Sequence, residues 1–289
     1  MAKPKTSISW VIFVAVMLIL QIAYVDAFFI EPNWIKVDRV RIADPGLAKA
    51  LGGLKVIHIS DLHIEKLGFV EMSLIRIVER LKPDIIFITG DVAETRQGAQ
   101  PVADVLSLLE PKFRAYMVIG ESPGDSLIAE LISSKMWDKA DVSILNHEAI
   151  RLNLKDRDDA YFWLVNPSSP KTLHELVKDI PKEEPVIVIN HFPEIVKQAA
   201  VEGLDLVLAG NTHGGQCGIP ILRKIFPYST RSAYISGLFK IKDTLLYVNR
   251  GITSQKGIRF FCRPEVTVLE FVPKGGMRRP KVLKQDESY

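Results

Sequence analysis

Aspartate and histidine side chains occur where several apolar runs of the sequence end. Asp61 and His63 follow one such run, and Asp91, His191 and His213 each follow another or lie in the turn after it. Residues two apart in an extended segment point the same way, so Asp61 and His63 can bind one ion together. A mixed set of carboxylates and imidazoles suits Mn²⁺, Fe²⁺ or Zn²⁺ better than an all-oxygen Mg²⁺ shell. The residue types therefore predict a transition-metal centre.

The elements that precede these residues must bring them together. Apolar runs of strand length alternate with segments of helical periodicity, which is typical of a layered α/β domain. Strands are predicted over residues 36–42, 54–59, 84–89, 113–119, 185–189, 204–209, 245–248 and 266–271, and helices over 70–81 and 102–109. Open α/β sheets bind ligands beyond the carboxyl ends of their strands, which is where these Asp and His residues lie.

The N-terminal segment Ile8–Val25 is apolar except for Ser9 and Gln21. A helix needs about twenty such residues to cross a bilayer, so the segment predicts a single transmembrane anchor within residues 1–35. A cleaved signal peptide is the alternative, because Val25-Asp26-Ala27 loosely resembles a small-residue cleavage site. Basic residues flank the segment on both sides, so the positive-inside rule does not predict the orientation.

The composition is that of a folded domain with an ordinary core. The net charge of +3 is small for 289 residues, and we expect no nucleic-acid partner, because such binding needs a concentrated basic face. The two cysteines, Cys217 and Cys262, are too few for a disulfide framework or a thiolate zinc site. We expect one domain over residues 36–272, a basic tail over residues 273–289, and a monomer.

Ordered motifs at the predicted strand ends resemble those of a known family. They are Asp61-x-His63, Gly90-Asp91, His191-Phe192-Pro193 and Thr212-His213-Gly214-Gly215-Gln216. In this order they resemble the calcineurin-like metallophosphoesterases, and with the N-terminal span they look like the membrane-anchored bacterial branch. The likeness covers residues 37–272. It implies an α/β fold of four layers, a β-sandwich flanked by helices, preceded here by one transmembrane helix.

The resemblance also implies one or two divalent metal ions, with Mn, Fe or Zn as the candidates. The first metal of the family would be held by Asp61, His63, Asp91 and His213. The second would take Asp91, which bridges the two, and His191, together with an Asn and a His that this chain replaces by Glu121 and Asn211. A carboxylate for an amide and an amide for an imidazole compensate each other in part, so we expect Glu121 to be a ligand.

The resemblance assigns catalytic roles to the positions of Asp91, Ser122 and Asn211. Where this chain has Ser122, the family has a histidine that stabilises the transition state and helps to protonate the leaving group. Loss of a general acid costs about 10²–10⁴-fold in rate. An alkoxide needs that proton, whereas a phosphate monoester with a second pKa of about 6 can leave a diphosphate without it. The sequence therefore favours a diphosphate substrate, or a slow or inactive enzyme.

An anchored domain suits an amphiphilic substrate. A relative of similar form hydrolyses UDP-2,3-diacylglucosamine, a precursor in lipid A biosynthesis. The resemblance thus implies a membrane lipid or lipid-linked substrate and a bacterial inner membrane, on a face that the sequence does not define. Arg250 and Arg263 are candidates for binding substrate phosphate, with an ion pair to Glu265 as the alternative. Residues 223–226 mix basic and apolar groups suited to the headgroup level, or form an ordinary loop.

Two other functions remain open on the sequence alone. One is a degenerate phosphoesterase that keeps a single metal and acts as a binding or scaffold protein. The other is a single-metal enzyme with altered chemistry. Metal content and the turnover of a phosphodiester discriminate between these functions and a two-metal hydrolase.

Overall fold

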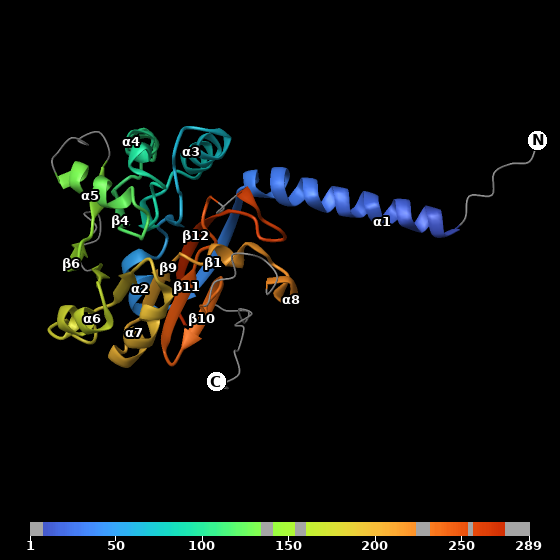
Figure 1. Ribbon diagram of the computed structural model, residues 1–289. Helices are drawn as coiled ribbons and strands as arrows, with labels where there is room; N and C mark the ends of the chain where they lie inside the picture. The colour runs from blue at the N-terminus through green and yellow to red at the C-terminus, as the bar shows by residue number, and fades with distance from the viewer. Residues whose placement is uncertain (1–7, 134–140, 154–159, 224–231, 254–256, 275–289) are drawn as a thin grey trace, which may run out of the picture.

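Two six-stranded sheets form the body of the protein, and the long helix α1 (Ile8–Val25) extends away from it (Figure 1). The computed structural model describes residues 8–133, 141–153, 160–223, 232–253 and 257–274. Both sheets mix parallel and antiparallel neighbours. Helices cover the outer faces of the sheets.

The first sheet carries the segments that contain Asp61 and Asp91. Its strands lie in the order β1 (Lys36–Ala43), β12 (Glu265–Val272), β2 (Val56–Ile59), β3 (Ile85–Thr89), β4 (Arg114–Val118) and β5 (Val142–Ile144). Strands β2 and β3 are parallel, with Ile59 opposite Ile88. The two loops that follow them therefore leave the sheet side by side.

The second sheet carries the segments that contain His191 and His213. Its strands lie in the order β10 (Gly237–Ile241), β11 (Thr244–Val248), β9 (Leu206–Ala209), β8 (Val186–Ile189), β7 (Tyr161–Asn166) and β6 (Glu148–Asn153). Strands β8 and β9 are parallel, with Ile189 opposite Leu208. Both histidine segments consequently start from the same edge of this sheet.

The helices divide between the two outer faces. Helices α3 (Phe69–Leu81), α4 (Ala99–Leu108) and α5 (Asp125–Ser133) lie on the first sheet, α6 (Pro170–Val177) and α7 (Val196–Glu202) on the second, and the short α2 (Pro45–Leu51) and α8 (Pro220–Arg223) lie apart from these groups. In Figure 1, α3 and α4 lie on the opposite side of the body from α6 and α7.

Three apolar clusters hold the layers together. Phe87 from the first sheet and Phe162 from the second are fully buried in the cluster between the sheets. A second cluster packs Leu74 of α3 and helix α4 against the first sheet, and a third packs Leu173 of α6 and helix α7 against the second. Burial of these side chains is the main stabilising contribution. The order helix, sheet, sheet, helix confirms the four-layer sandwich predicted from the sequence.

The predicted strands agree with the structure to within two residues at each end. Strands β5, β6 and β7 in the middle of the chain were not predicted, and neither was β10. Strands β5 and β6 are half-buried or exposed along their length, so they lack the apolar run that marks a core strand. Residues 224–226 and 275–289, for which a membrane-level loop and a basic tail were expected, lie outside the described residues.

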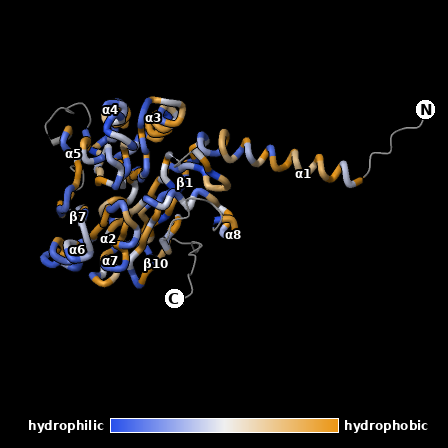
Figure 2. The backbone as a smooth tube through the Cα atoms, viewed as in Figure 1, coloured by the Kyte–Doolittle hydropathy of each residue, from blue (hydrophilic) through white to orange (hydrophobic). Residues whose placement is uncertain are grey.

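Helix α1 is a candidate membrane span. None of its residues is buried, and the helical stretch Ile8–Asn33 is long and apolar enough to cross a membrane. Figure 2 shows hydrophobic residues along most of α1 where it stands clear of the body. A π-helical turn (Asp26–Ile30) and a 3₁₀ turn (Glu31–Asn33) connect it to β1, and Ala27 and Glu31 are buried in this junction.

Candidate metal centre

The predicted ligands from the two sheets lie together at the edge that the sheets share. Main-chain bonds join the loops after β2 and β3, from Asp61 N to Gly90 O (3.1 Å) and from His63 N to Asp91 O (2.9 Å). Asn211 N, in the loop after β9, donates to the carboxylate of Asp61 at 3.0–3.1 Å, which links the second sheet to the first. Residues about 150 positions apart in the chain are therefore neighbours at this edge.

Strained backbone marks the ligand positions. Asp61, His63, Asp91 and His213 have φ values of +50°, +43°, +52° and +47°. Non-glycine residues rarely adopt positive φ, and such strain concentrates at functional sites. A Cβ atom on Gly210 would lie 1.8 Å from Ser60 Oγ and 2.5 Å from Asp61 Oδ2, so only glycine allows this approach. The positive φ values and the close approach at Gly210 thus occur where the Asp and His side chains converge.

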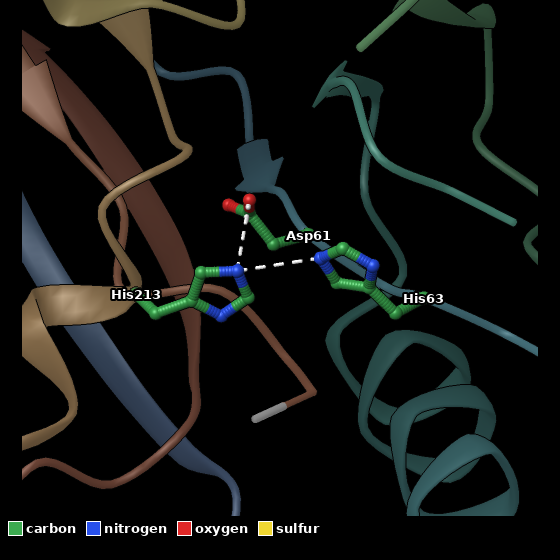
Figure 3. A group of neighbouring side chains, drawn as sticks. All are labelled: Asp61, His63 and His213. Carbon is green, nitrogen blue, oxygen red and sulfur yellow. Dashed lines mark hydrogen bonds and ion pairs between the residues drawn. The ribbon is translucent and has the colours of Figure 1, made fainter. Parts of the chain in front are cut away.

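The ligand atoms form two overlapping groups, and the members of each lie within 4.8 Å of one another. The first group is Asp61, His63 and His213 (Figure 3). His213 Nε2 lies 3.5 Å from Asp61 Oδ1 and 3.3 Å from His63 Nε2. The second group is Asp61, Asp91 and His191. All five predicted Asp and His residues are therefore brought together.

Asp91 belongs to the second group and also lies close to His63 of the first. Its Oδ2 atom is 3.6 Å from His63 Nε2 and 3.4 Å from His191 Nε2, one histidine from each group. Its other oxygen, Oδ1, accepts hydrogen bonds from the main-chain amides of Glu121 (2.6 Å) and Ser122 (2.8 Å). These amides orient the carboxylate, so that Oδ2 faces both histidines.

Each histidine of the centre is oriented through its Nδ1 atom. Nδ1 of His191 is 2.8 Å from Thr89 O, and Nδ1 of His213 is 3.0 Å from Thr253 O. Nδ1 of His63 is 2.5 Å from a carboxylate oxygen of Glu94. Because carbonyl and carboxylate oxygens only accept, Nδ1 carries a proton, and Nε2 is the ring nitrogen that points into the centre.

This arrangement fits divalent metal ions. A metal-binding histidine normally donates its second ring N–H to a carboxylate or a carbonyl, as all three do here. The Nε2 atom of His191 is buried and has no hydrogen-bond partner among the described residues, which a metal ion would supply. Three imidazoles and two carboxylates suit Mn²⁺, Fe²⁺ or Zn²⁺. The donor set thus agrees with the cofactor that the sequence predicts.

Burial and neighbouring charges shift the pKa values in this centre. Burial alone opposes ionisation of Asp91, but the close imidazoles of His191 and His63 hold the pKa of Asp91 well below its ordinary value. Burial also opposes the charged form of His191, yet Asp91 and Asp61 raise its pKa to about 9. For His213, burial dominates and lowers the pKa to about 4. Of these two histidines, His191 is therefore the one that holds a proton beside the carboxylates at neutral pH.

The three positions that depart from the family pattern lie in different surroundings. Ser122 is buried, and its Oγ atom is 3.3 Å from His63 Nδ1. Asn211 is half-buried and reaches the centre through its main-chain amide. The side chain of Glu121 is exposed, and its carboxylate belongs to neither ligand group found among the described residues. Glu121 contacts the centre through its main chain alone in the described structure.

Arg250 and Arg263 lie outside both ligand groups. Arg250 forms ion pairs with Glu265 and Asp38, the arrangement expected if its role is structural. The guanidinium of Arg263 stacks on Trp34 at 3.9 Å from the ring centroid, and its Nε donates to Trp34 O at 2.9 Å. The structure therefore places both arginines in a separate polar pocket at the end of α1.

Several residues that support the centre were missed from the sequence. Asp125 accepts hydrogen bonds from the amides of Val92, Ala93 and Gly120, which ties the loop after Asp91 to the loop before Ser122. Glu94 and Thr253 orient His63 and His213. An acidic residue three positions after Asp91 was a usable signal for Glu94. Thr253 acts through its main-chain oxygen, which no sequence pattern identifies.

Comparison with known proteins agrees with this geometry. The family described as calcineurin-like phosphoesterase matches residues 54–215. The phosphodiesterase YaeI of Escherichia coli is 29% identical over 84% of this chain and 91% of its own length. The uncharacterized metallophosphoesterase YkuE of Bacillus subtilis is 25% identical over 85% of this chain and 88% of its own. The UDP-2,3-diacylglucosamine pyrophosphatase LpxG of Chlamydia muridarum is 23% identical over 86% and 92%.

Proposed function

The chain belongs to the calcineurin-like phosphoesterase family, and we propose that it is a membrane-anchored hydrolase of a phosphate ester or diphosphate bond in a lipid-linked substrate. One observation carries this proposal: a buried set of three oriented imidazoles and two carboxylates lies on a body whose N-terminal helix is apolar enough to span a membrane. Such a helix keeps the centre close to a bilayer, where amphiphilic substrates are concentrated.

The residues of the centre perform distinct tasks. Divalent metals supply Lewis acidity towards a phosphoryl oxygen and towards water when they are bound. Asp61 and Asp91 provide the negative charge that attracts them, and the histidines present unprotonated Nε2 atoms once His191 has lost its proton. Glu94, Thr89 and Thr253 hold the imidazole rings in place, so little reorganisation accompanies binding.

The surroundings of Ser122 support a diphosphate substrate. Its hydroxyl lies beside His63, and an unperturbed serine is far too weak an acid to replace an imidazolium as proton donor. A phosphate leaving group does not need that proton, whereas an alkoxide does. The likeness to a UDP-2,3-diacylglucosamine pyrophosphatase supports the same class of substrate, and with it a bacterial inner-membrane location.

Metal content and turnover of the purified full-length chain in detergent test this function. We expect at least one tightly bound ion, Mn²⁺-dependent hydrolysis of UDP-2,3-diacylglucosamine, and slower hydrolysis of bis(4-nitrophenyl) phosphate. Asp61→Ala should lose the ion and the activity, because Asp61 belongs to both ligand groups. Asp243→Ala is the matched control, since that carboxylate is 96% exposed and lies in the β10–β11 turn.

One observation favours a second function. The exposed side chain of Glu121 leaves the second metal without the ligand that was expected from the sequence. A protein with one ion and no turnover of any ester would then be a binding or scaffold protein. Two ions per chain with turnover would exclude that function.

A further inference from the structure

An apolar groove runs along the end of α1. Its walls are α1 residues together with the adjacent rings of Phe260 and Phe261, and its volume is about 740 Å³. The lining extends from Leu18 in α1 to Ile30 in the π-helical turn that follows it. Small-molecule sites usually enclose 300–1,000 Å³, so the groove has the size of a ligand site. Because α1 is the candidate membrane span, this groove opens towards hydrocarbon rather than water.

The loop that carries the two rings is tied to the junction below α1. Arg259 N donates to Ala27 O at 2.9 Å, and the carboxylate of Glu31 accepts hydrogen bonds from the amides of Phe261 and Cys262. Phe261 adopts φ = +51°, which is unusual for an aromatic residue, and 67% of the residue is exposed. A strained backbone and three hydrogen bonds thus hold an exposed phenyl ring beside the membrane helix.

A polar pocket adjoins the apolar groove. It has a volume of about 400 Å³ and shares Asp26 and Phe261 with the groove. Trp34 and Arg263 form its outer side, with Trp34 59% exposed and the guanidinium stacked on its ring. Tryptophan and arginine favour the bilayer interface, where one part of the side chain is apolar and the other is hydrated. The polarity therefore changes from apolar to charged where α1 leaves the span.

Arg263 is the group suited to bind a phosphate. A guanidinium has five N–H donors, and the bonds of Arg263 to described residues occupy its Nε and Nη2 atoms. Its remaining donors can bind anionic oxygens bidentately. Lys36 adds positive charge nearby, although Asp38 lies 2.6 Å from its amine. The carboxylate of Glu31 is engaged by main-chain amides, which reduces its repulsion of an anion.

We propose that this junction binds one phospholipid of the bilayer. One acyl chain would occupy the groove between α1 and the Phe260–Phe261 pair, and the phosphate would lie against Arg263. The site contains none of the five metal ligands. The inference rests on α1 spanning the membrane, but not on hydrolysis at the metal centre. The bound lipid would fix the angle between α1 and the body, and so hold the metal centre at a constant height above the bilayer.

Native mass spectrometry of the full-length chain in detergent tests the site, with phosphatidylglycerol, diacylglycerol of the same acyl chains, and inorganic phosphate as probes. We expect one phosphatidylglycerol per chain. Ile22→Trp fills the groove and should lower the retention of phosphatidylglycerol about tenfold, which corresponds to a difference of about 1.4 kcal/mol in binding free energy. Leu20→Trp is the matched control, because Leu20 is exposed on the same helix but does not line the groove. Arg263→Gln should weaken phosphatidylglycerol binding and leave diacylglycerol unchanged.

The proposal would be overturned if no phospholipid were retained, if Ile22→Trp and Leu20→Trp lost equal amounts of lipid, or if phosphatidylglycerol and diacylglycerol were retained equally. Displacement of the lipid by inorganic phosphate would also refute it, since that would indicate a free-anion site. Circular dichroism of each variant verifies that it is folded. Asp61→Ala should retain the lipid while losing its metal, which separates this inference from the proposed hydrolysis.

Discussion

Arg259 and His213 donate hydrogen bonds to the same main-chain oxygen, that of Thr253, at 2.7 Å and 3.0 Å. Arg259 is completely buried and also donates to the carbonyls of Arg250, Gly251 and Cys262. Its own amide is bonded to Ala27 O, at the end of α1. Arg259 therefore connects the turn that follows α1 to the acceptor that orients His213 in the candidate metal centre.

Replacing Arg259 should weaken metal binding. Arg259→Lys keeps the charge but cannot reach four carbonyl oxygens, so Thr253 O would move and His213 would lose its orientation. Mutation of such supporting groups costs about 10–100-fold in metal affinity, and we expect a value near the lower end. Mn²⁺ titration with calorimetry measures it, and Arg263→Lys, at a half-buried arginine four residues away, is the control. Unchanged affinity in Arg259→Lys would show that the shared oxygen is irrelevant to the centre.

Glu94 should orient His63 through its carboxylate. Glu94→Ala removes the acceptor of the 2.5 Å contact with Nδ1 and should weaken Mn²⁺ binding about 10–100-fold. Glu94→Gln keeps an acceptor oxygen and should restore part of that loss. Glu65→Ala removes an exposed carboxylate of the loop after His63 and should have no effect. The same affinity in all three variants would refute the role of Glu94.

The rate of the wild-type enzyme should depend steeply on the leaving group. Without a general acid, diesters with acidic phenols should react far faster than those with alkyl alcohols. Ser122→His should raise the turnover of poor leaving groups by about 10–100-fold and leave diphosphate turnover nearly constant. A series of substituted phenyl phosphodiesters measures the slope of the logarithm of the rate against the pKa of the leaving phenol. An identical slope in both proteins would exclude a proton donor at this position.

Asp205 should make the protein less stable as the pH rises. Burial, and then the charge of Asp44, raise the pKa of Asp205 to about 6 in the folded protein, above its ordinary value of 3.8. Its contribution is therefore fully present below pH 3.8 and is lost as the pH rises through 6. Asp205→Asn keeps the acceptor for Val186 N and should stabilise the protein at pH 8 by about 1–2 kcal/mol, allowing for partial exposure.

Urea unfolding at pH 4 and pH 8 measures this difference. At pH 4 the two proteins should have nearly equal free energies of unfolding. Asp243→Asn, which removes an exposed carboxylate, should change neither value. Stabilisation of equal size at both pH values would mean that ionisation of Asp205 is not the cause.

The junction after α1 should be part of the folded domain. A chain that begins at residue 36 lacks Ala27 O and the Glu31 carboxylate, which accept from the amides of Arg259, Phe261 and Cys262. An unsatisfied buried group costs about 1–3 kcal/mol, so this chain should be less stable than one beginning at residue 26 by about 2–4 kcal/mol. Urea unfolding measures the free energy of unfolding of both chains. Equal values would place the domain boundary at residue 36.

The sequence alone identified the Asp and His residues of the candidate metal centre and most of the strands that carry them. Asp61, His63, Asp91, His191 and His213 follow apolar runs, and the periodicity of those runs depends only on nearby residues. The four-layer fold was predictable from the ordered motifs. Strands β5 and β6 were not, because half-exposed strands lack an apolar signature.

Only the tertiary structure decided how the centre is supported and where the arginines lie. Thr89 and Thr253 orient histidines through their main-chain oxygens, and Arg259 donates to the main-chain oxygen of Thr253. Which main-chain oxygen lies beside a histidine depends on loop packing and not on the type of side chain. Arg250 and Arg263 carry the charge expected of a phosphate site, yet Glu265 and Asp38 hold Arg250, and Trp34 holds Arg263, at the junction with α1. Charge identifies a residue that can bind phosphate, but the partner it contacts depends on the folded chain.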